Sequence, residues 1–262
     1  MGFLSDVVAD VRSDLARAPL DESMLMARIL AMPPTRDFAA SLRDSAGPSP
    51  KVIAEVKRSS PSAGRLADPD PGEQAAAYEE AGACAISVLT EPRHFDGSLA
   101  DLRIVRRRTS VPLLRKDFLI HPSQLMQARA EGADAVLLIT ASLSPIELAA
   151  LLATAKDLSL GTLVETHSEE DLEVAIESGA EIIGVNARDL ETLEVDARQA
   201  LERLRQVPDD RVAVMESGID DREQVVAAVD AGASAILVGE ALMRAGDPGA
   251  KLRELLGASP GP

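Results

Sequence analysis

The sequence has few residues suited to holding a metal ion or a disulfide. It contains one cysteine, Cys84, and three histidines among 262 residues, and no Cys or His pair stands at a metal-ligand spacing. A single cysteine cannot form an internal disulfide, and Cys84 lies in an apolar run, so we expect a buried thiol. The sequence therefore gives no reason to expect a metal site.

Positive charge is also scarce. The chain carries 27 Lys and Arg against 43 Asp and Glu, a formal net charge of −16. Nucleic acid and anionic membrane surfaces require a basic face, so neither is expected as a partner. An anionic ligand would have to be held locally, by a few lysines and by backbone N–H groups.

Long hydrophobic runs are absent. No uninterrupted apolar stretch approaches the length needed to span a bilayer. The opening residues, MGFLSDVVAD, place acids within the apolar stretch and have no basic lead-in, unlike a secretory signal. We therefore expect a soluble cytoplasmic protein.

Residues 1–50 predict a helical extension that packs on the rest of the chain. Asp21 is a candidate N-cap for a second helix, which Pro33-Pro34 would stop. A third helical piece, RDFAASLRD, precedes a linker over 45–51 that is rich in Gly, Pro and Ser. The first helix would carry one apolar face, formed by Phe3, Leu4, Val7, Val8, Val11 and Leu15.

Residues 51–262 alternate between strand and helix patterns. Amphipathic helical stretches such as IELAALLATAKDL follow apolar strands, which implies right-handed crossovers and a parallel sheet. Eight units in this length predict a single (β/α)₈ barrel, although an open doubly wound sheet also alternates. The expected strands lie near 52–56, 84–89, 111–115, 134–139, 160–165, 181–186, 211–216 and 234–239.

An internal repeat favours the barrel. The phrases AGACAISVL, EGADAVLLI, SGAEIIGVN and AGASAILVG each place a glycine shortly before an apolar strand. Each glycine would end a helix in a left-handed cap. The repeat marks every second strand, and four evenly spaced pairs suit a closed barrel better than an open sheet. The glycines are Gly82, Gly132, Gly179 and Gly232.

The stretch 52–64, VIAEVKRSSPSAG, carries the first candidate for chemistry. Glu55 and Lys57 stand two positions apart on a predicted strand, so their side chains share one face. Charges at a buried strand end are tolerable only when they are paired or used. A structural ion pair would explain this stretch equally well when it is taken alone.

Other predicted strands also end in ionisable residues. Active sites of such barrels lie at the carboxyl ends of the strands. Two lysines and three carboxylates around one opening would shift each other's proton affinities, as acid–base catalysis requires. A ring of ion pairs is the alternative; it explains Arg188 equally well, whereas Lys116 and Glu165 favour catalysis. The candidates are Glu55, Lys57, Lys116, Glu165, Asn186, Arg188, Glu216 and Ser217.

The last two strands end in glycine-containing turns. Gly218 in ESGIDDREQ and Gly239 in VGEALMR stand directly before helical segments, where exposed N–H groups can bind phosphate. Glu240 would contribute its backbone N–H. Taken singly, each glycine could be an ordinary turn residue. Phe95 and Phe118 follow the second and third strands and could line the site for an aromatic substrate or simply pack in the core.

Two further features lie near the same rim. We interpret His94, His121 and His167 as solvated loop residues. The connection over 58–71 is long for a βα loop and could move as a lid.

Several stretches together resemble the indole-3-glycerol phosphate synthase family of tryptophan biosynthesis. They are IAEVKRSSPSAG, VLTEPRHFDGS, PLLRKDF, LVETH, GVNARDLETLEVD, ESGI and VGEALM, in the family's order. Ala187 departs from the Asn common in the family, and we expect its side chain to point away from the site. Met215 is bulkier than expected and could perturb packing below the opening.

The resemblance implies closure, decarboxylation and dehydration of 1-(2-carboxyphenylamino)-1-deoxyribulose 5-phosphate, with no cofactor or metal. Lys116 resembles the general acid, and Glu165 and Lys57 resemble the partners in proton removal and loss of hydroxide. Glu55 resembles the carboxylate that orients Lys57. Asn186, Glu216 and Ser217 are similar to the family's substrate-positioning groups. The phosphate site would comprise Ser60, Gly218, Gly239 and Glu240.

Three other functions stay open from the residues alone. A sugar-phosphate isomerase could use Lys116 with Glu165, but Glu55, Lys57 and the helical extension would be surplus. A Schiff-base aldolase could use Lys116. A non-catalytic barrel could bind a phosphorylated ligand or a partner enzyme. A monomer and contacts with neighbouring tryptophan-pathway enzymes are both compatible with the sequence.

Overall fold

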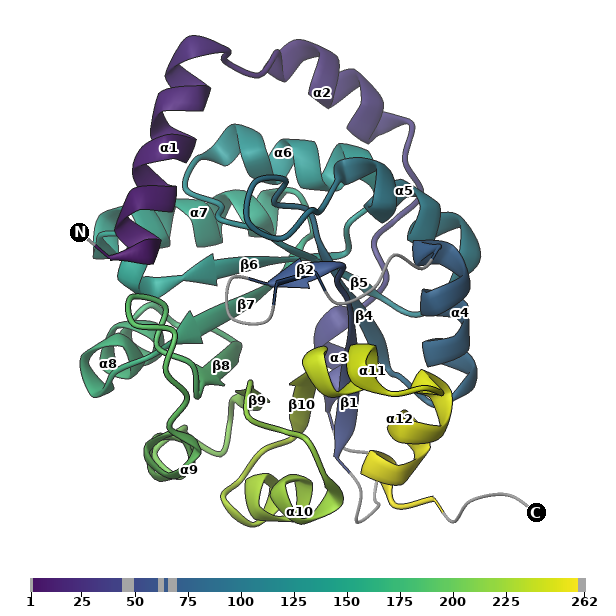
Figure 1. Ribbon diagram of the computed structural model, residues 1–262. Coiled ribbons are helices and arrows are strands. Elements are labelled where there is room, and N and C mark those ends of the chain that lie inside the picture. The colour runs from purple at the N-terminus through teal and green to yellow at the C-terminus, as the bar shows by residue number, and fades with distance from the viewer. Residues whose placement is uncertain (1, 44–49, 61–63, 66–69, 259–262) are drawn as a thin grey trace.

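Eight parallel strands form a closed barrel, as the sequence predicts (Figure 1). The computed structural model describes residues 2–43, 50–60, 64–65 and 70–258. The strand order is β1-β10-β9-β8-β7-β6-β5-β4, and β2 (Ser59–Ser60) pairs separately with β3 (Gly64–Arg65). The barrel strands are β1 (Lys51–Val56), β4 (Ala85–Leu89), β5 (Leu113–Lys116), β6 (Ala135–Ile139), β7 (Gly161–Thr166), β8 (Ile182–Asn186), β9 (Val212–Glu216) and β10 (Ala235–Val238).

Most helices after the barrel strands begin at side-chain caps, but the helix that begins at Glu240 has none. Ser144, for example, accepts a hydrogen bond from the Glu147 N–H and so satisfies a free donor of the first turn. The short η1 (Thr140–Ser142) follows β6. The helices that follow β1 are α4 (Pro71–Glu80), α5 (Leu99–Arg108), α6 (Pro122–Glu131), α7 (Pro145–Asp157), α8 (Glu169–Glu177), α9 (Ala197–Leu204), α10 (Arg222–Asp230), α11 (Glu240–Arg244) and α12 (Pro248–Leu256).

The glycines of the repeat have the predicted left-handed backbone. Their φ angles are +105° at Gly82, +99° at Gly132, +78° at Gly179 and +104° at Gly232. A residue with a side chain is strained in this region, so glycine ends each helix before the next strand without that strain. The strands that follow are β4, β6, β8 and β10, every second strand of the barrel.

Three helices precede the barrel: α1 (Phe3–Arg17), α2 (Glu22–Leu30) and α3 (Phe38–Leu42). Asp21 caps α2 as expected, accepting hydrogen bonds from the Ser23 and Met24 N–H groups. α2 packs along α6, and α3 packs against β1 and β4 (Figure 1). Phe38 and Leu42 of α3 are buried with the residues that fill the barrel, and so close its amino-terminal end.

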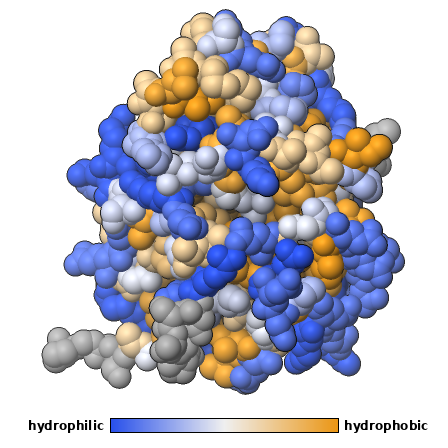
Figure 2. Space-filling model, turned by 180° about the vertical axis from the view of Figure 1, so that it is seen from behind, coloured by the Kyte–Doolittle hydropathy of each residue, from blue (hydrophilic) through white to orange (hydrophobic). Residues whose placement is uncertain are grey.

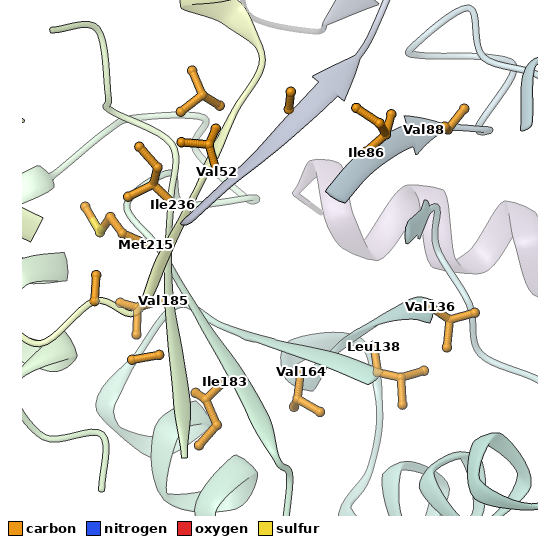
Figure 3. Packing of buried hydrophobic residues seen from close by; sticks show 14 of the residues in the cluster. Val52, Ile86, Val88, Val136, Leu138, Val164, Ile183, Val185, Met215 and Ile236 are labelled. Carbon is orange, nitrogen blue, oxygen red and sulfur yellow. The ribbon is translucent and has the colours of Figure 1, made fainter. Parts of the chain in front are cut away.

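Strand residues alternate between two cores. One core fills the barrel, and the other lies between strands and helices, where Figure 3 shows Val52, Val164, Met215 and Ile236. The expectation that Met215 perturbs packing below the opening is wrong. Alternation directs Val214 and Glu216 inward and Met215 outward, where it is 1% exposed.

The side chains of Ala187 and Cys84 both lie away from the cavity described below. Ala187 packs in the outer core and does not line the cavity described below, as expected. Cys84 is only partly buried, less than expected, and its Sγ lies 3.3 Å from the Val52 carbonyl oxygen. Burial raises the pKa of the Cys84 thiol to about 11.

The outer surface mixes polar and apolar residues, as the view from behind shows (Figure 2). Three large apolar side chains are exposed on α2, at Met24, Met26 and Leu30. Within the described ranges, every helix is too short or too polar to cross a membrane.

Candidate active site

A cavity of about 280 Å³ opens at the carboxyl ends of the barrel strands. All but one of the predicted site residues line it, although they are spread over most of the chain. Ser60 ends β2, and its side chain lies outside the described part of the structure. The predicted residues that line the cavity are Glu55, Lys57, Phe95, Lys116, Phe118, Glu165, Asn186, Arg188, Glu216, Ser217, Gly218, Gly239 and Glu240.

Lys116 lies among carboxylates on the cavity floor. Its Nζ is 2.9 Å from Oε2 of Glu165 and 3.2 Å from Oε2 of Glu216. Lys116 ends β5, Glu165 is the last residue but one of β7, Glu216 ends β9, and Glu55 lies on β1. The four charged residues thus come from alternate strands of the barrel, the arrangement by which such barrels build one interior layer.

The two carboxylates beside Lys116 differ in charge. Burial alone would raise the pKa of Glu165, but the Lys116 ammonium and then His167 outweigh it and hold that pKa well below its usual range. For Glu216, burial and then the negative charge of Glu165 raise the pKa to about 8, against the pull of Lys116. At neutral pH, Glu165 is therefore ionised and Glu216 is protonated.

The charge state of Lys116 follows from the same groups. Burial would lower its pKa, but the carboxylates of Glu165, Glu216 and Glu55 outweigh burial and raise it. Lys116 is therefore an ammonium that faces the cavity and can donate a proton.

Glu55 of β1 and Lys57, just beyond that strand, form the expected pair. Glu55 Oε1 lies 2.7 Å from Lys57 Nζ, and both side chains are largely buried. Gly239 lies directly against this pair: a Cβ added at that position would collide with the Glu55 carboxylate. The glycine after β10 therefore leaves room for Glu55 as well as exposing its backbone to the cavity.

The turn after β9 has an unusual backbone. Ser217 has a φ of +64° and Gly218 a φ of +70°, two successive residues in the left-handed region. A serine is strained there, and such strain often marks a functional site. Ser217, Gly218 and Gly239 all border the cavity, which is where a bound phosphate is expected from the sequence.

Aromatic rings form one wall of the cavity. The ring centres of Phe95 and Phe118 are 6.3 Å apart, and Phe3 is 6.3 Å from Phe118 in an edge-on arrangement. Sequence reasoning predicted the first two but assigned Phe3 only to the apolar face of a helix. Its place in the wall depends on how α1 lies across the barrel, for which the sequence contains no local signal.

Two other contributors were missed from the sequence. Glu91 is buried and accepts hydrogen bonds from the N–H groups of Arg93, His94 and Phe95, which shapes the loop that carries Phe95. Gly184 on β8 leaves space for Glu216, because a Cβ there would collide with that carboxylate. The TEPRHF stretch contains Glu91, but nothing in it indicates that the side chain turns back on its own loop.

The interpretation of the three histidines as solvated loop residues is largely wrong. His94 is half-buried, with its ring 5.1 Å from that of Phe3. His121 is exposed but caps α6 by accepting the Ser123 N–H. His167 is only 10% exposed, with Nε2 3.1 Å from Oε1 of Glu165. The loops at this end are packed against each other, so a loop position does not imply solvation.

Arg188 combines both interpretations offered for it. Its Nη2 lies 3.3 Å from Oε2 of Glu240, and its Nη1 donates to the Leu193 carbonyl oxygen at 3.0 Å. The same side chain lines the cavity. The predicted lid over 58–71 includes residues 61–63 and 66–69, which lie outside the described residues, so that prediction stays open.

Within the described residues, no group of three His, Cys, Asp or Glu side chains is arranged to hold a metal ion. The polar groups that line the cavity are instead two ammonium groups, the Arg188 guanidinium, carboxyl groups, the Asn186 amide and the Ser217 hydroxyl.

Comparisons with known proteins agree with this geometry. The family model described as "Indole-3-glycerol phosphate synthase" matches residues 4–255. Indole-3-glycerol phosphate synthase from Rhodococcus opacus (strain B4) is 48% identical over 265 residues, covering 100% of this chain and 97% of that protein. The protein of the same name from Nocardioides sp. is 49% identical, covering 98% of this chain and 99% of that relative.

Solved structures of lower identity support the fold alone. A thiamine phosphate pyrophosphorylase from Pyrococcus furiosus superposes with a TM-score of 0.61 at 19% identity, covering 84% of this chain and 96% of that chain. A 3-hexulose-6-phosphate synthase from Salmonella typhimurium gives a TM-score of 0.65 at 15% identity, covering 79% of this chain and 97% of that chain.

Proposed function

This chain belongs to the indole-3-glycerol phosphate synthase family, and from this premise we propose the reaction that its cavity carries out. The substrate is 1-(2-carboxyphenylamino)-1-deoxyribulose 5-phosphate. The enzyme closes the ring, removes carbon dioxide and water, and releases indole-3-glycerol phosphate. The observation that carries this proposal is the Lys116 ammonium held between Glu165 and Glu216 at the cavity floor.

Ring closure requires a proton at the ketone oxygen as the aryl carbon attacks the carbonyl carbon. Lys116 is the proposed donor, because its ammonium faces the cavity and its carboxylate partners keep it charged. In the substrate complex, the ketone oxygen would lie within hydrogen-bond distance of Lys116 Nζ. It would then join or replace one of the two glutamate oxygens that contact Nζ here.

Loss of carbon dioxide is favoured when the substrate carboxylate is desolvated. The wall formed by Phe3, Phe95 and Phe118 is apolar and would stack against the aromatic ring that carries this carboxylate. The electrons of the breaking C–C bond then return to the ring and restore its aromaticity.

Dehydration needs a base for one proton and an acid for the departing hydroxide. We assign these roles to Glu165 and Lys57 as a pair. Glu165 is held ionised, and Lys57 is oriented by Glu55 at 2.7 Å. Glu165 lies on β7 and Lys57 directly follows β1, so the substrate can be approached from both sides.

The remaining groups position the substrate. Asn186 donates to Oε1 of Glu165 at 3.1 Å, and Glu216 has a buried Oε1 without a hydrogen-bond partner among the described residues. A substrate hydroxyl would satisfy that oxygen. We propose that Ser217 contributes here, and that the phosphate binds at the backbone N–H groups of Gly218, Gly239 and Glu240, with Ser60.

The charge on Lys116 argues against a Schiff-base aldolase. An amine must lose its proton before it can attack a carbonyl, and here the neighbouring carboxylates raise the pKa of Lys116. Borohydride with substrate should therefore leave the protein unmodified at Lys116.

The direct test adds the anilino-ribulose phosphate to the purified protein. The chain has no tryptophan, so an indole fluorescence signal would come from the product alone. We expect this signal together with one carbon dioxide for each product molecule. Absence of both at saturating substrate would contradict the proposed function.

Replacing Lys116 separates an enzyme from a barrel that only binds. In Lys116→Ala we expect kcat to fall by about 100-fold or more, with KM changed much less, because proton donation acts on the chemical steps. Lys156→Ala changes an exposed lysine on α7 and is the matched control. Unchanged turnover in Lys116→Ala would remove this mechanism.

We also propose a cytoplasmic setting and a phosphorylated aromatic small molecule as the partner. The acidic net charge of −16 and the single cysteine support the cytoplasmic setting. The glycine-containing turns that border the cavity, at Gly218 and Gly239, support a phosphorylated ligand. Gel filtration coupled to light scattering would test whether the protein is a monomer.

A further inference from the structure

His167 reaches the catalytic carboxylate from the side away from the cavity. It follows β7 directly, and its Nε2 lies 3.1 Å from Oε1 of Glu165. The imidazole is 10% exposed and does not line the cavity. It therefore contacts Glu165 without reaching the space that substrate would occupy.

The two oxygens of Glu165 have different surroundings. Oε2 faces Lys116 at 2.9 Å, whereas Oε1 is approached by Asn186 Nδ2 at 3.1 Å and by His167 Nε2 at the same distance. One oxygen is thus directed to the acid–base partner, and the other is enclosed by two nitrogens from neighbouring strands or loops.

The backbone around His167 is fixed independently. Its N–H donates to Asp171 Oδ2 at 3.0 Å, as part of the cap at the start of α8. Acidic groups surround His167: Glu165 lies at its ring, Asp189 after β8 is within electrostatic range, and Asp171 of α8 accepts its backbone N–H. All three are acids, and Lys116 lies beyond Glu165.

Both ring nitrogens are buried, and neither has an aligned hydrogen-bond partner among the described residues. A carboxylate oxygen can only accept, so the close approach of Nε2 to Oε1 requires the proton on Nε2. Here a buried N–H group lies close to a carboxylate oxygen without being aligned for a hydrogen bond. Such a contact beside a catalytic group is typical of one that shortens when substrate binds.

We propose that His167 is a positioning residue for Glu165: its Nε2–H group holds Oε1, so that Oε2 stays directed at Lys116 and the substrate. This inference rests on the proposed function, since it assigns a role within that reaction. Without His167, Oε1 of Glu165 would be held by Asn186 alone, and the carboxylate could turn more readily about its last bond.

The test compares two substitutions at one position. His167→Leu removes the donor and keeps an apolar side chain, whereas His167→Gln retains an N–H donor at a similar reach. We expect kcat to fall about tenfold or more in His167→Leu with KM within about threefold, because misdirected catalytic groups mainly affect kcat. His167→Gln should recover kcat to within about threefold of wild type. His121→Asn, which keeps a helix cap away from the cavity, is the matched control.

The pH dependence of kcat provides a readout that simple packing would not move. The His167 contact lowers the pKa of Glu165, so its removal should raise that pKa. The acidic limb of the kcat profile should therefore shift to higher pH in His167→Leu and much less in His167→Gln.

Nitrogen NMR of histidine-labelled protein tests the contact without turnover. The chain has three histidines, and the spectrum of His167→Gln assigns the resonance that belongs to His167. We expect a proton on Nε2. The NMR measurement does not depend on whether the wild-type protein forms indole. It therefore separates failure of this inference from failure of the proposed function.

Three outcomes would overturn the inference. They are a tautomer with the proton on Nδ1 alone, kcat in His167→Leu within twofold of wild type, and equal losses of kcat in the Leu and Gln variants. The last would mean that the shape of the imidazole matters and its N–H group does not. If His167→Leu does not fold, the Gln variant and the NMR measurement still decide.

Discussion

At the scale of single residues, two glutamates beside one lysine differ in charge: Glu165 is ionised, whereas burial and the charge of Glu165 keep Glu216 protonated. Lys116 is nearer to Glu165, at 2.9 Å, than to Glu216, at 3.2 Å. Glu165 also has His167 beside it, whereas Glu216 has the charge of Glu165. One carboxylate therefore ionises and the other keeps its proton, which separates a base from a hydrogen-bond donor in the same cavity.

This difference predicts how stability depends on pH. The pKa of Glu216 rises from 4.5 to about 8 in the folded protein, so its contribution to the free energy of unfolding is present below about pH 4.5 and is lost as the pH rises toward 8. Glu216→Gln cannot ionise. Its Tm relative to wild type should therefore increase between pH 5 and pH 8.5, by about 3 °C or more.

The matched control for this measurement is Glu177→Gln, an exposed carboxylate at the end of α8. Its Tm difference from wild type should not change over the same pH range. A Tm difference for Glu216→Gln that is flat across this range would show that Glu216 ionises normally.

At the scale of the elements, two glycines leave room for ionisable side chains from neighbouring strands. Gly184 on β8 leaves space for the Glu216 carboxylate of β9, and Gly239 after β10 leaves space for Glu55 of β1. Interior layers of such barrels are usually filled with branched apolar residues. Here small neighbours are needed, because the layer contains long ionisable side chains whose positions determine the chemistry.

Gly184→Ala tests this requirement. The added methyl group would collide with the Glu216 carboxylate and lie 3.2 Å from Leu163 Cδ1. We expect kcat/KM to fall by about 100-fold, because displacing Glu216 also misplaces Lys116. Gly246→Ala is the control, since nothing lies within 4 Å of a Cβ at that position. Equal kcat/KM in the two variants would show that Glu216 adjusts without cost.

At the scale of the whole molecule, the first helix completes a cavity formed mainly by the barrel. α1 brings Phe3 to the wall beside Phe118, and its residues Leu4 and Val7 are buried. Ion pairs also link α1 to the barrel domain, such as Arg12 with Glu147 of α7 at 3.1 Å, but exposed pairs of this kind add little. Apolar packing is therefore what holds Phe3 in place.

Removing the Phe3 ring should weaken substrate binding more than chemistry. In Phe3→Ala we expect KM to rise by about three- to tenfold with kcat changed less, the range expected when one aromatic contact is lost. Met24→Ala, on the exposed side of α2, controls for a change elsewhere in the helical extension. Steady-state kinetics with the anilino-ribulose phosphate make the comparison, and an unchanged KM would exclude Phe3 from the binding wall.

Much of this protein could be predicted from the sequence because the deciding signals are local. Alternation along each strand determines which side chains face inward, and the repeated glycines end helices before every second strand. Residues such as Glu55, Lys116 and Glu216 stand at predicted strand ends, and parallel strands in a barrel bring their carboxyl ends together. The barrel and most of the residues around its opening follow from those two periodicities.

Only the tertiary structure decided what lies beside those residues. Phe3 enters the wall because the start of α1 lies beside Phe118, and His167 is 10% exposed beside Glu165. Gly184 matters because a carboxyl group from the next strand lies against it. The charge states of Glu165 and Glu216 also depend on distances of about 3 Å to Lys116. Such contacts join residues far apart in the chain, and a burial or a distance between them has no counterpart in any local pattern.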